Sequence, residues 1–126
     1  MKKVLLVEDD AAIIDIYQMM IKKAHFDVEV LSLGQEVIKK MQRVEAKEEE
    51  APDIVLLDLI LPDINGIEVL KAIKTNDATK DIKVFILTNQ EESGVHPSGD
   101  IKPDKFLIKA NITPTKLIEL IKKELS

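Results

Sequence analysis

The chain has 126 residues, of which 45% are apolar, and this is enough for the buried core of one domain that we expect to span residues 1–126. Its net charge of −5 argues against a nucleic-acid partner, because nucleic-acid-binding domains usually carry a basic face. The sequence has no cysteine, no signal peptide and no apolar run near the roughly twenty residues of a membrane span, so we expect a cytoplasmic protein without disulfides, thiolate sites or membrane contact.

The first strand is predicted at residues 4–7, an aliphatic run that ends in three consecutive acidic residues, Glu8, Asp9 and Asp10. Apolar residues at helical spacing follow, and Ile16 is one of those that we place on the buried face. Asp9 and Asp10 are both suitable N-caps for this helix.

A second strand is predicted at residues 28–31, and a second amphipathic helix follows it. Ser32 and Gln35 have the spacing of a capping box at the start of that helix. The helix ends in the acidic segment 45–50, which has almost no apolar stripe and is interpreted as a solvated tail.

The third strand, at residues 54–57, is apolar at every position, which is typical of a central strand in a parallel sheet. It stops at Asp58. A loop containing Pro62 follows, and Gly66 lies where the third helix is expected to begin.

The fourth and fifth strands are predicted at residues 82–87 and 106–108, followed by Thr88 and Lys109 respectively. The segment between them holds two glycines and two prolines, so we expect its helix to be short or irregular. Thr113 is the expected N-cap of the last helix, with proline at the first helical position.

Alternating strands and helices predict an α/β fold, because parallel strands need crossover helices. Five strands in this length suit a doubly wound, flavodoxin-like parallel sheet in the order 2-1-3-4-5. In that order the first and third strands are neighbours at the point where the direction of winding reverses, and ligands bind beyond the carboxyl ends of the strands at such points.

Polar residues with useful chemistry stand at these strand ends: Glu8, Asp9, Asp58, Thr88 and Lys109. Converging carboxylates repel by about 4 kcal/mol at 4 Å and an effective dielectric of 20, so one of them takes a proton or a cation lies between them. The ligands on offer are all oxygens, which favours a hard ion such as Mg²⁺. A hydroxyl and an ammonium opposite that ion would bind a phosphoryl group, which Asp58 could accept as a nucleophile.

Each of these residues also has an ordinary structural interpretation when taken alone. Asp9 or Asp10 is a helix cap, Asp58 a polar loop residue, Lys109 a surface lysine and Thr88 a good strand former. Their shared placement at strand ends is what favours the functional interpretation.

The chain resembles the receiver domains of two-component response regulators over essentially its whole length. The resemblance is carried by KVLLVEDD, DIVLLDLILPDINGIEVLKAIK, VFILT and DKFLIK. It implies that Asp58 is the phosphoacceptor and that Mg²⁺ is held by Glu8, Asp9, Asp58 and the backbone carbonyl of Ile60. It implies no separate enzymatic function beyond assistance to the domain's own phosphorylation and dephosphorylation.

The resemblance also implies a phosphoryl-sensing pair, Thr88 and Lys109, and a switch in which Thr88 moves inward and Phe106 turns in. The phosphoryl donor would be a phosphohistidine on a sensor histidine kinase or a histidine phosphotransfer protein. Since no output domain is recognised in the chain, a stand-alone receiver would signal by contact with an unknown protein target.

Two departures from the family pattern stand beside the site. Ala110 follows Lys109 where a cis proline is usual, and we expect a trans bond because a cis bond before a non-proline residue costs about 3–4 kcal/mol. Asn89 follows Thr88 where a small residue is usual. Because the usual Lys-Pro step is missing, a degenerate receiver that acts only as a binding module is an alternative.

Two other classes of phosphate-handling protein rank lower. A haloacid-dehalogenase-type phosphatase would need a second aspartate where this chain has Ile60. A nucleotide-binding domain would need a glycine-rich phosphate loop after the first strand, and there is none.

Overall fold

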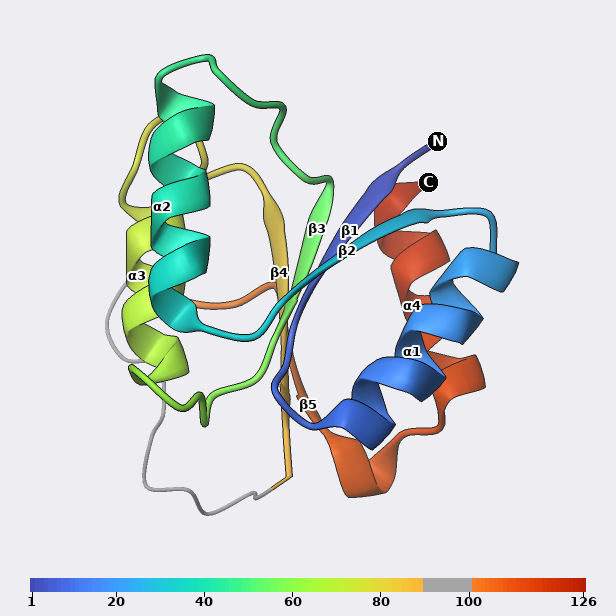
Figure 1. Cartoon of the computed structure of the whole chain (residues 1–126). Helices are drawn as coiled ribbons and strands as arrows, with labels where there is room; N and C mark the ends of the chain where they lie inside the picture. The colour runs from blue at the N-terminus through green and yellow to red at the C-terminus, as the bar shows by residue number, and fades with distance from the viewer. Residues whose placement is uncertain (90–100) are drawn as a thin grey trace.

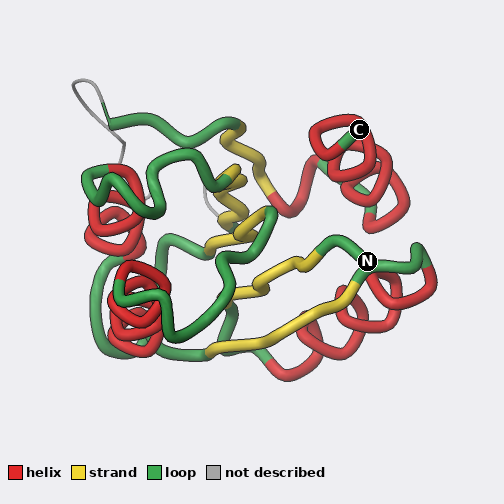
Figure 2. Tube along the Cα trace, turned by 90° about the horizontal axis from the view of Figure 1, so that it is seen from above, coloured by secondary structure: helices red, strands yellow, loops and turns green. Residues whose placement is uncertain are grey.

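The computed structural model describes residues 1–89 and 101–126, which form one parallel sheet between two pairs of helices. The elements in chain order are β1 (Lys3–Val7), α1 (Ala11–Lys23), β2 (Asp27–Leu31), α2 (Gly34–Glu45), β3 (Ile54–Leu57), α3 (Gly66–Lys74), β4 (Lys83–Thr88), β5 (Lys105–Ile108), a short 3₁₀ turn (Lys109–Asn111) and α4 (Pro114–Leu125). The strand order is β2-β1-β3-β4-β5, with α1 and α4 on one face and α2 and α3 on the other (Figure 1). Seen from above, the two helix pairs flank the sheet (Figure 2).

The predicted flavodoxin-like doubly wound sheet and its strand order are confirmed, and each predicted strand lies within one residue of the observed one at either end. The short or irregular helix expected between Thr88 and Lys109 falls largely on residues 90–100, which lie outside the described residues. None of the helices in the described part of the chain is both long and apolar enough to cross a bilayer.

The central strands are buried on both faces because their residues are apolar at successive positions. Leu5 and Ile86 belong to the core cluster on the side of α2 and α3, whereas Leu6 and Phe85 belong to the cluster on the side of α1 and α4. The strands are thereby fixed in register, and the residues that follow them are brought to one edge of the sheet.

The prediction that Ile16 is buried is wrong, since this residue is 47% exposed. Helix α1 packs Tyr17 and Ile21 against the sheet instead. Ile16 precedes Tyr17 by one position and is therefore turned about 100° away on the helix surface.

Helix N-termini are capped partly as predicted. Asp10 caps α1 and Thr113 caps α4, each accepting a hydrogen bond from backbone N–H groups of the first turn. The capping box of Ser32 and Gln35 is wrong, because α2 begins at Gly34 with no side-chain cap of its own. The carboxylate of Asp63, from the loop after β3, takes over this task.

The C-termini of α1 and α2 both end in a Schellman motif without glycine. In α2, the Lys47 N–H donates to the Val44 carbonyl at 3.0 Å and the Glu48 N–H donates to the Arg43 carbonyl at 2.9 Å. Lys47 has a φ of 62°, and His25 takes the same place after α1 with a φ of 67°. Both residues therefore adopt a left-handed conformation that is unfavourable for a side chain with a Cβ atom.

Replacing Lys47 by glycine should raise the free energy of unfolding by about 0.5–1 kcal/mol. Glycine removes the strain at the left-handed position, and the greater freedom of the unfolded chain offsets part of this gain. Urea unfolding would measure the change. Lys47→Ala is the matched control, because it removes the side chain but keeps the Cβ atom, and an equal gain in this control would contradict the explanation.

Candidate functional site

The carboxyl ends of four strands meet at one edge of the sheet and bring together the polar residues that follow them. Val7 pairs with Leu57 in the register of β1 and β3, so Glu8 and Asp58 emerge side by side. The Asp58 N–H donates to the Val7 carbonyl at 3.1 Å, which holds the two chain segments together one residue beyond the paired strands. The predicted convergence of acidic residues is confirmed in this geometry.

Glu8, Asp9 and Asp58 form a group that could hold a metal ion, since one carboxylate oxygen from each lies within 4.8 Å of the others. Glu8 and Asp58 are buried, whereas Asp9 is exposed. One oxygen of Glu8 accepts hydrogen bonds from the backbone N–H groups of Asp9 at 3.1 Å and Asp10 at 3.2 Å. The all-oxygen donor set and its excess of negative charge suit a hard divalent cation such as Mg²⁺.

A cavity of about 270 Å³ opens over this group and gives it access to solvent. Ile60, which is 55% exposed, lies at the rim on the loop after β3. The Ile60 N–H donates to Asp58 at 3.3 Å, so that the backbone of this loop reaches the carboxylate directly. Asn89 also lines the cavity. It is the residue after Thr88, where the resemblance to receiver domains predicts a small side chain.

Lys109 begins the 3₁₀ turn after β5, and its ammonium lies between the two buried carboxylates. It donates a hydrogen bond to Glu8 and lies 3.4 Å from an oxygen of Asp58. Burial lowers the pKa of Lys109, but the hydrogen bond to Glu8 and the charge of Asp58 outweigh burial, so that the pKa is raised. The bond from Lys109 to Ala110 is trans, as predicted.

Asp58 is only 7% exposed, and burial raises its pKa to about 6. The charge of Lys109 lowers this pKa, and the neighbouring Glu8 carboxylate raises it. In the absence of a metal ion, the negative charge of Asp58 therefore lowers the free energy of unfolding at neutral pH.

Replacing Asp58 by asparagine should stabilise the metal-free protein at neutral pH by about 2 kcal/mol. The pKa of Asp58 is higher in the folded than in the unfolded chain, so its contribution to stability is full below about pH 4 and is lost as the pH rises through 6. Urea unfolding in EDTA at several pH values would measure the difference. It should vanish below about pH 4 and reach a plateau above pH 7, and a gain that is equal at all pH values would contradict this cause.

Thr88 and Phe106 lie on neighbouring strands beneath the site. Thr88 is completely buried, and its hydroxyl is without a hydrogen-bond partner among residues 1–89 and 101–126. An unpartnered buried hydroxyl is costly, and an anion bound beside it would satisfy it. Phe106 is half-buried and packs against the core cluster on the side of α2 and α3.

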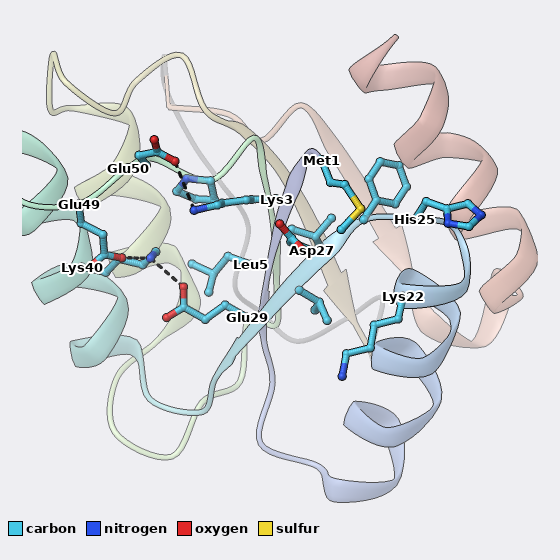
Figure 3. Close-up of a pocket in the computed structure, with 14 residues that line it drawn as sticks. Met1, Lys3, Leu5, Lys22, His25, Asp27, Glu29, Lys40, Glu49 and Glu50 are labelled. Carbon is cyan, nitrogen blue, oxygen red and sulfur yellow. Dashed lines mark hydrogen bonds and ion pairs between the residues drawn. The ribbon is translucent and has the colours of Figure 1, made fainter.

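A larger cavity, of about 590 Å³, lies at the opposite end of the sheet, around the starts of β1 and β2. Five of its charged side chains form ion pairs: Lys40 with Glu29 at 2.8 Å and with Glu49, and Lys3 with Glu50 at 3.3 Å (Figure 3). Segment 45–50 is thus not wholly the solvated tail that its composition indicates. The buried Lys40 of α2 forms an ion pair with Glu49, which lies in the chain after that helix. No periodic pattern in the sequence indicates this contact.

Asp63 is a residue of the site loop that sequence reasoning missed. Its two carboxylate oxygens accept hydrogen bonds from the Gly34 N–H at 2.8 Å and from the Gln35 N–H at 2.9 Å. These bonds lower the pKa of Asp63. The partners are almost thirty residues apart in the chain, so no local motif could have indicated the contact.

Comparison with known proteins gives consistent matches. A family model for the response regulator receiver domain matches residues 4–122. The alkaline phosphatase synthesis transcriptional regulatory protein PhoP of Bacillus subtilis (strain 168) is 33% identical over 91 residues, which are 72% of this chain and 35% of PhoP. The chain spans about a quarter to a third of the length of the curated relatives that it matches.

Two solved structures have the same fold. The receiver domain of sensor histidine kinase PA1611 from Pseudomonas aeruginosa PAO1, which has a magnesium ion in its active-site cleft, matches with a TM-score of 0.80 and 18% identity over 98% of this chain and 97% of that one. The Mn²⁺-bound response regulator Rcp1 matches with a TM-score of 0.79 and 30% identity over 98% of this chain and 91% of that one.

Proposed function

Because the chain belongs to the response regulator receiver domain family of two-component signalling, we propose that it accepts a phosphoryl group on Asp58. The observation that carries the proposal is the buried ion pair of Lys109 with Asp58 beside a cluster of acidic oxygens. Glu8, Asp9, Asp58 and the Ile60 carbonyl would hold Mg²⁺, with Asp9 as the direct ligand of the acidic pair and Glu8 acting through water. When bound, this ion would neutralise charge on the phosphoryl oxygens.

Side chains of the protein itself would carry out the other steps of phosphoryl transfer. A carboxylate oxygen of Asp58 attacks phosphorus, and the bond from phosphorus to the donor nitrogen breaks as the new acyl phosphate bond forms. Lys109 lies within reach of Asp58 and balances the charge of the transferred group. The buried hydroxyl of Thr88 then donates to a phosphoryl oxygen, which gives this hydroxyl the partner that it lacks among the described residues.

Movement of Thr88 toward the phosphoryl group is the proposed start of the output switch. It would leave room for Phe106, which pairs with Ile86 two positions before the end of β4, to turn inward. The changed surface would bind a downstream protein. We propose that a sensor histidine kinase or a histidine phosphotransfer protein in the cytoplasm supplies the phosphoryl group.

The direct test is incubation with acetyl phosphate or phosphoramidate and Mg²⁺, followed by intact-mass measurement. The wild-type protein should gain the mass of one phosphoryl group, and Asp58→Ala should gain none. EDTA should prevent labelling of the wild type. An unlabelled wild type, or equal labelling of the Asp58→Ala variant, would remove Asp58 as the phosphoacceptor.

A second candidate function is a degenerate receiver that binds a partner without being phosphorylated. It is favoured by Ala110, which stands where the family usually has proline, and by the trans bond before it. Thermal unfolding with increasing Mg²⁺ separates the two functions, because an ion that binds only the folded protein raises its stability. A melting temperature that does not respond to Mg²⁺ would favour the binding module.

A further inference from the structure

We propose that Asp63 is a positioning residue for the metal site, because it ties the loop that carries the Ile60 carbonyl to the N-terminus of α2. The inference rests on the proposed function of the acidic cluster. Asp63 lies outside that cluster and would act on the ion only through the backbone of its own loop.

The loop between Asp58 and Gly66 is short, and its two ends are closed on each other. The Gly66 N–H donates to the Leu59 carbonyl at 2.7 Å, and Ile60 and Asn65 form an isolated β-bridge. These contacts define the shape of the loop. They do not fix its position relative to β1, which supplies the other acidic residues of the site.

Two kinds of contact fix the loop in space. Leu59 and Leu61 are buried in the core cluster on the side of α2 and α3. Asp63 is exposed, and it reaches across the surface to the first two N–H groups of α2. Those groups have no intrahelical acceptor, and the start of a helix attracts negative charge. The two hydrogen bonds therefore fix the orientation of the Asp63 carboxylate relative to α2.

The chain leading into α2 is in turn tied to the metal site. Leu31, the last residue of β2, accepts a hydrogen bond from the Glu8 N–H at 3.1 Å. A connected path therefore runs from Glu8 through the end of β2 and the start of α2 to Asp63 and back to Ile60. Loss of the link at Asp63 would leave the two sides of the metal site joined only through the sheet and the core.

The test is isothermal titration of Mg²⁺ into the wild type and into Asp63→Ala. The affinity of Asp63→Ala should fall by about 3–10-fold, which is less than the loss seen when a direct partner of a metal ligand is removed. Asp63→Asn keeps one acceptor oxygen and should lose less, and it also provides a folded variant if the alanine variant is unstable.

Lys39→Gly is the matched control, because Lys39 is exposed on α2 and glycine lowers the stability of the helix without contacting the loop. It should bind Mg²⁺ as the wild type does. An unchanged affinity in Asp63→Ala and Asp63→Asn, or an equal loss in Lys39→Gly, would overturn the positioning role while leaving the proposed function intact.

If the contact of Asp63 with α2 affects Mg²⁺ binding, Mg²⁺ binding must also affect that contact, because coupling between two sites is reciprocal. Amide hydrogen exchange measures this second effect. Mg²⁺ should slow exchange at Gly34 and Gln35 in the wild type and should not do so in Asp63→Ala. The same response in both proteins would overturn the inference. A wild type that binds no Mg²⁺ would overturn the proposed function, and this inference with it.

Discussion

Replacing Lys109 by methionine should destabilise the metal-free protein by about 3–5 kcal/mol at pH 7. The side chain of Lys109 is 7% exposed and lies between Glu8 and Asp58, which are themselves 2% and 7% exposed. Without the ammonium, two buried carboxylates face each other with no cation between them. Methionine fills a similar volume, so the loss reports the charge and not a cavity. Urea unfolding in EDTA would measure it.

The dependence on pH and on the metal identifies the cause of this loss. Lys109 lowers the pKa of Asp58, so its removal raises that pKa further above the value in the unfolded chain. The defect should therefore shrink as the pH falls below about 4, where Asp58 becomes protonated in both states, and grow as the pH rises to 7 and beyond. Added Mg²⁺ should restore part of the stability at pH 7 by replacing the lost positive charge.

Two further variants make this prediction easy to contradict. Lys105→Met removes a lysine at the start of β5, the strand that leads to Lys109, and this side chain has no ion pair within the described part of the chain. It should change stability by no more than about 0.5 kcal/mol. Adding Glu8→Gln to Lys109→Met should recover stability, because it removes one of the two facing charges. A Lys109→Met protein as stable as the wild type at pH 7 would mean that the ion pair contributes nothing.

The strand ends could be predicted from the sequence because their positions depend on short-range signals. The apolar run of β3 ends at Asp58 and that of β1 ends just before Glu8, and parallel pairing brings such ends to one edge whatever the loops do. The cap at Asp10 is also local, since its partners are two and three residues ahead. The roles of these residues in phosphoryl transfer stay predictions until the labelling experiment is done.

The contacts that sequence reasoning missed join segments far apart in the chain. The capping box at Ser32 was wrong because Asp63, a carboxylate from another loop, occupies the place that a local side chain would have taken. Lys40 is buried although lysine is usually exposed, because Glu29 and Glu49 reach it from a strand and from the chain after α2. Such pairs follow from the packing of loops, and no periodic pattern in the sequence records them.

Replacing Gly66 by alanine should destabilise the protein by about 3 kcal/mol. A Cβ atom at this position would lie 2.4 Å from the Asp58 carbonyl oxygen and 2.6 Å from the Leu59 Cα atom. Both are backbone atoms at the end of β3, so they can move away only if the strand end moves with them. Urea unfolding would measure the loss of stability, and Mg²⁺ titration at a temperature where the variant is folded should show weakened binding, because Asp58 moves with its backbone.

Gly34→Ala is the control that separates a backbone clash from a side-chain clash. A Cβ atom at Gly34 would also meet close neighbours, at 2.4 Å and 2.8 Å from the side chain of Ile64 and at 2.9 Å from that of Val69. These are side-chain atoms, and Ile64 is only partly buried and can turn away, whereas Val69 is fully buried on α3. The loss should therefore be smaller than for Gly66→Ala, at about 1–2 kcal/mol. If both variants lost the same stability, the close approach of Gly66 to the backbone of Asp58 would not be the cause. If Gly66→Ala kept full Mg²⁺ affinity, the position of the β3 end would not control the metal site.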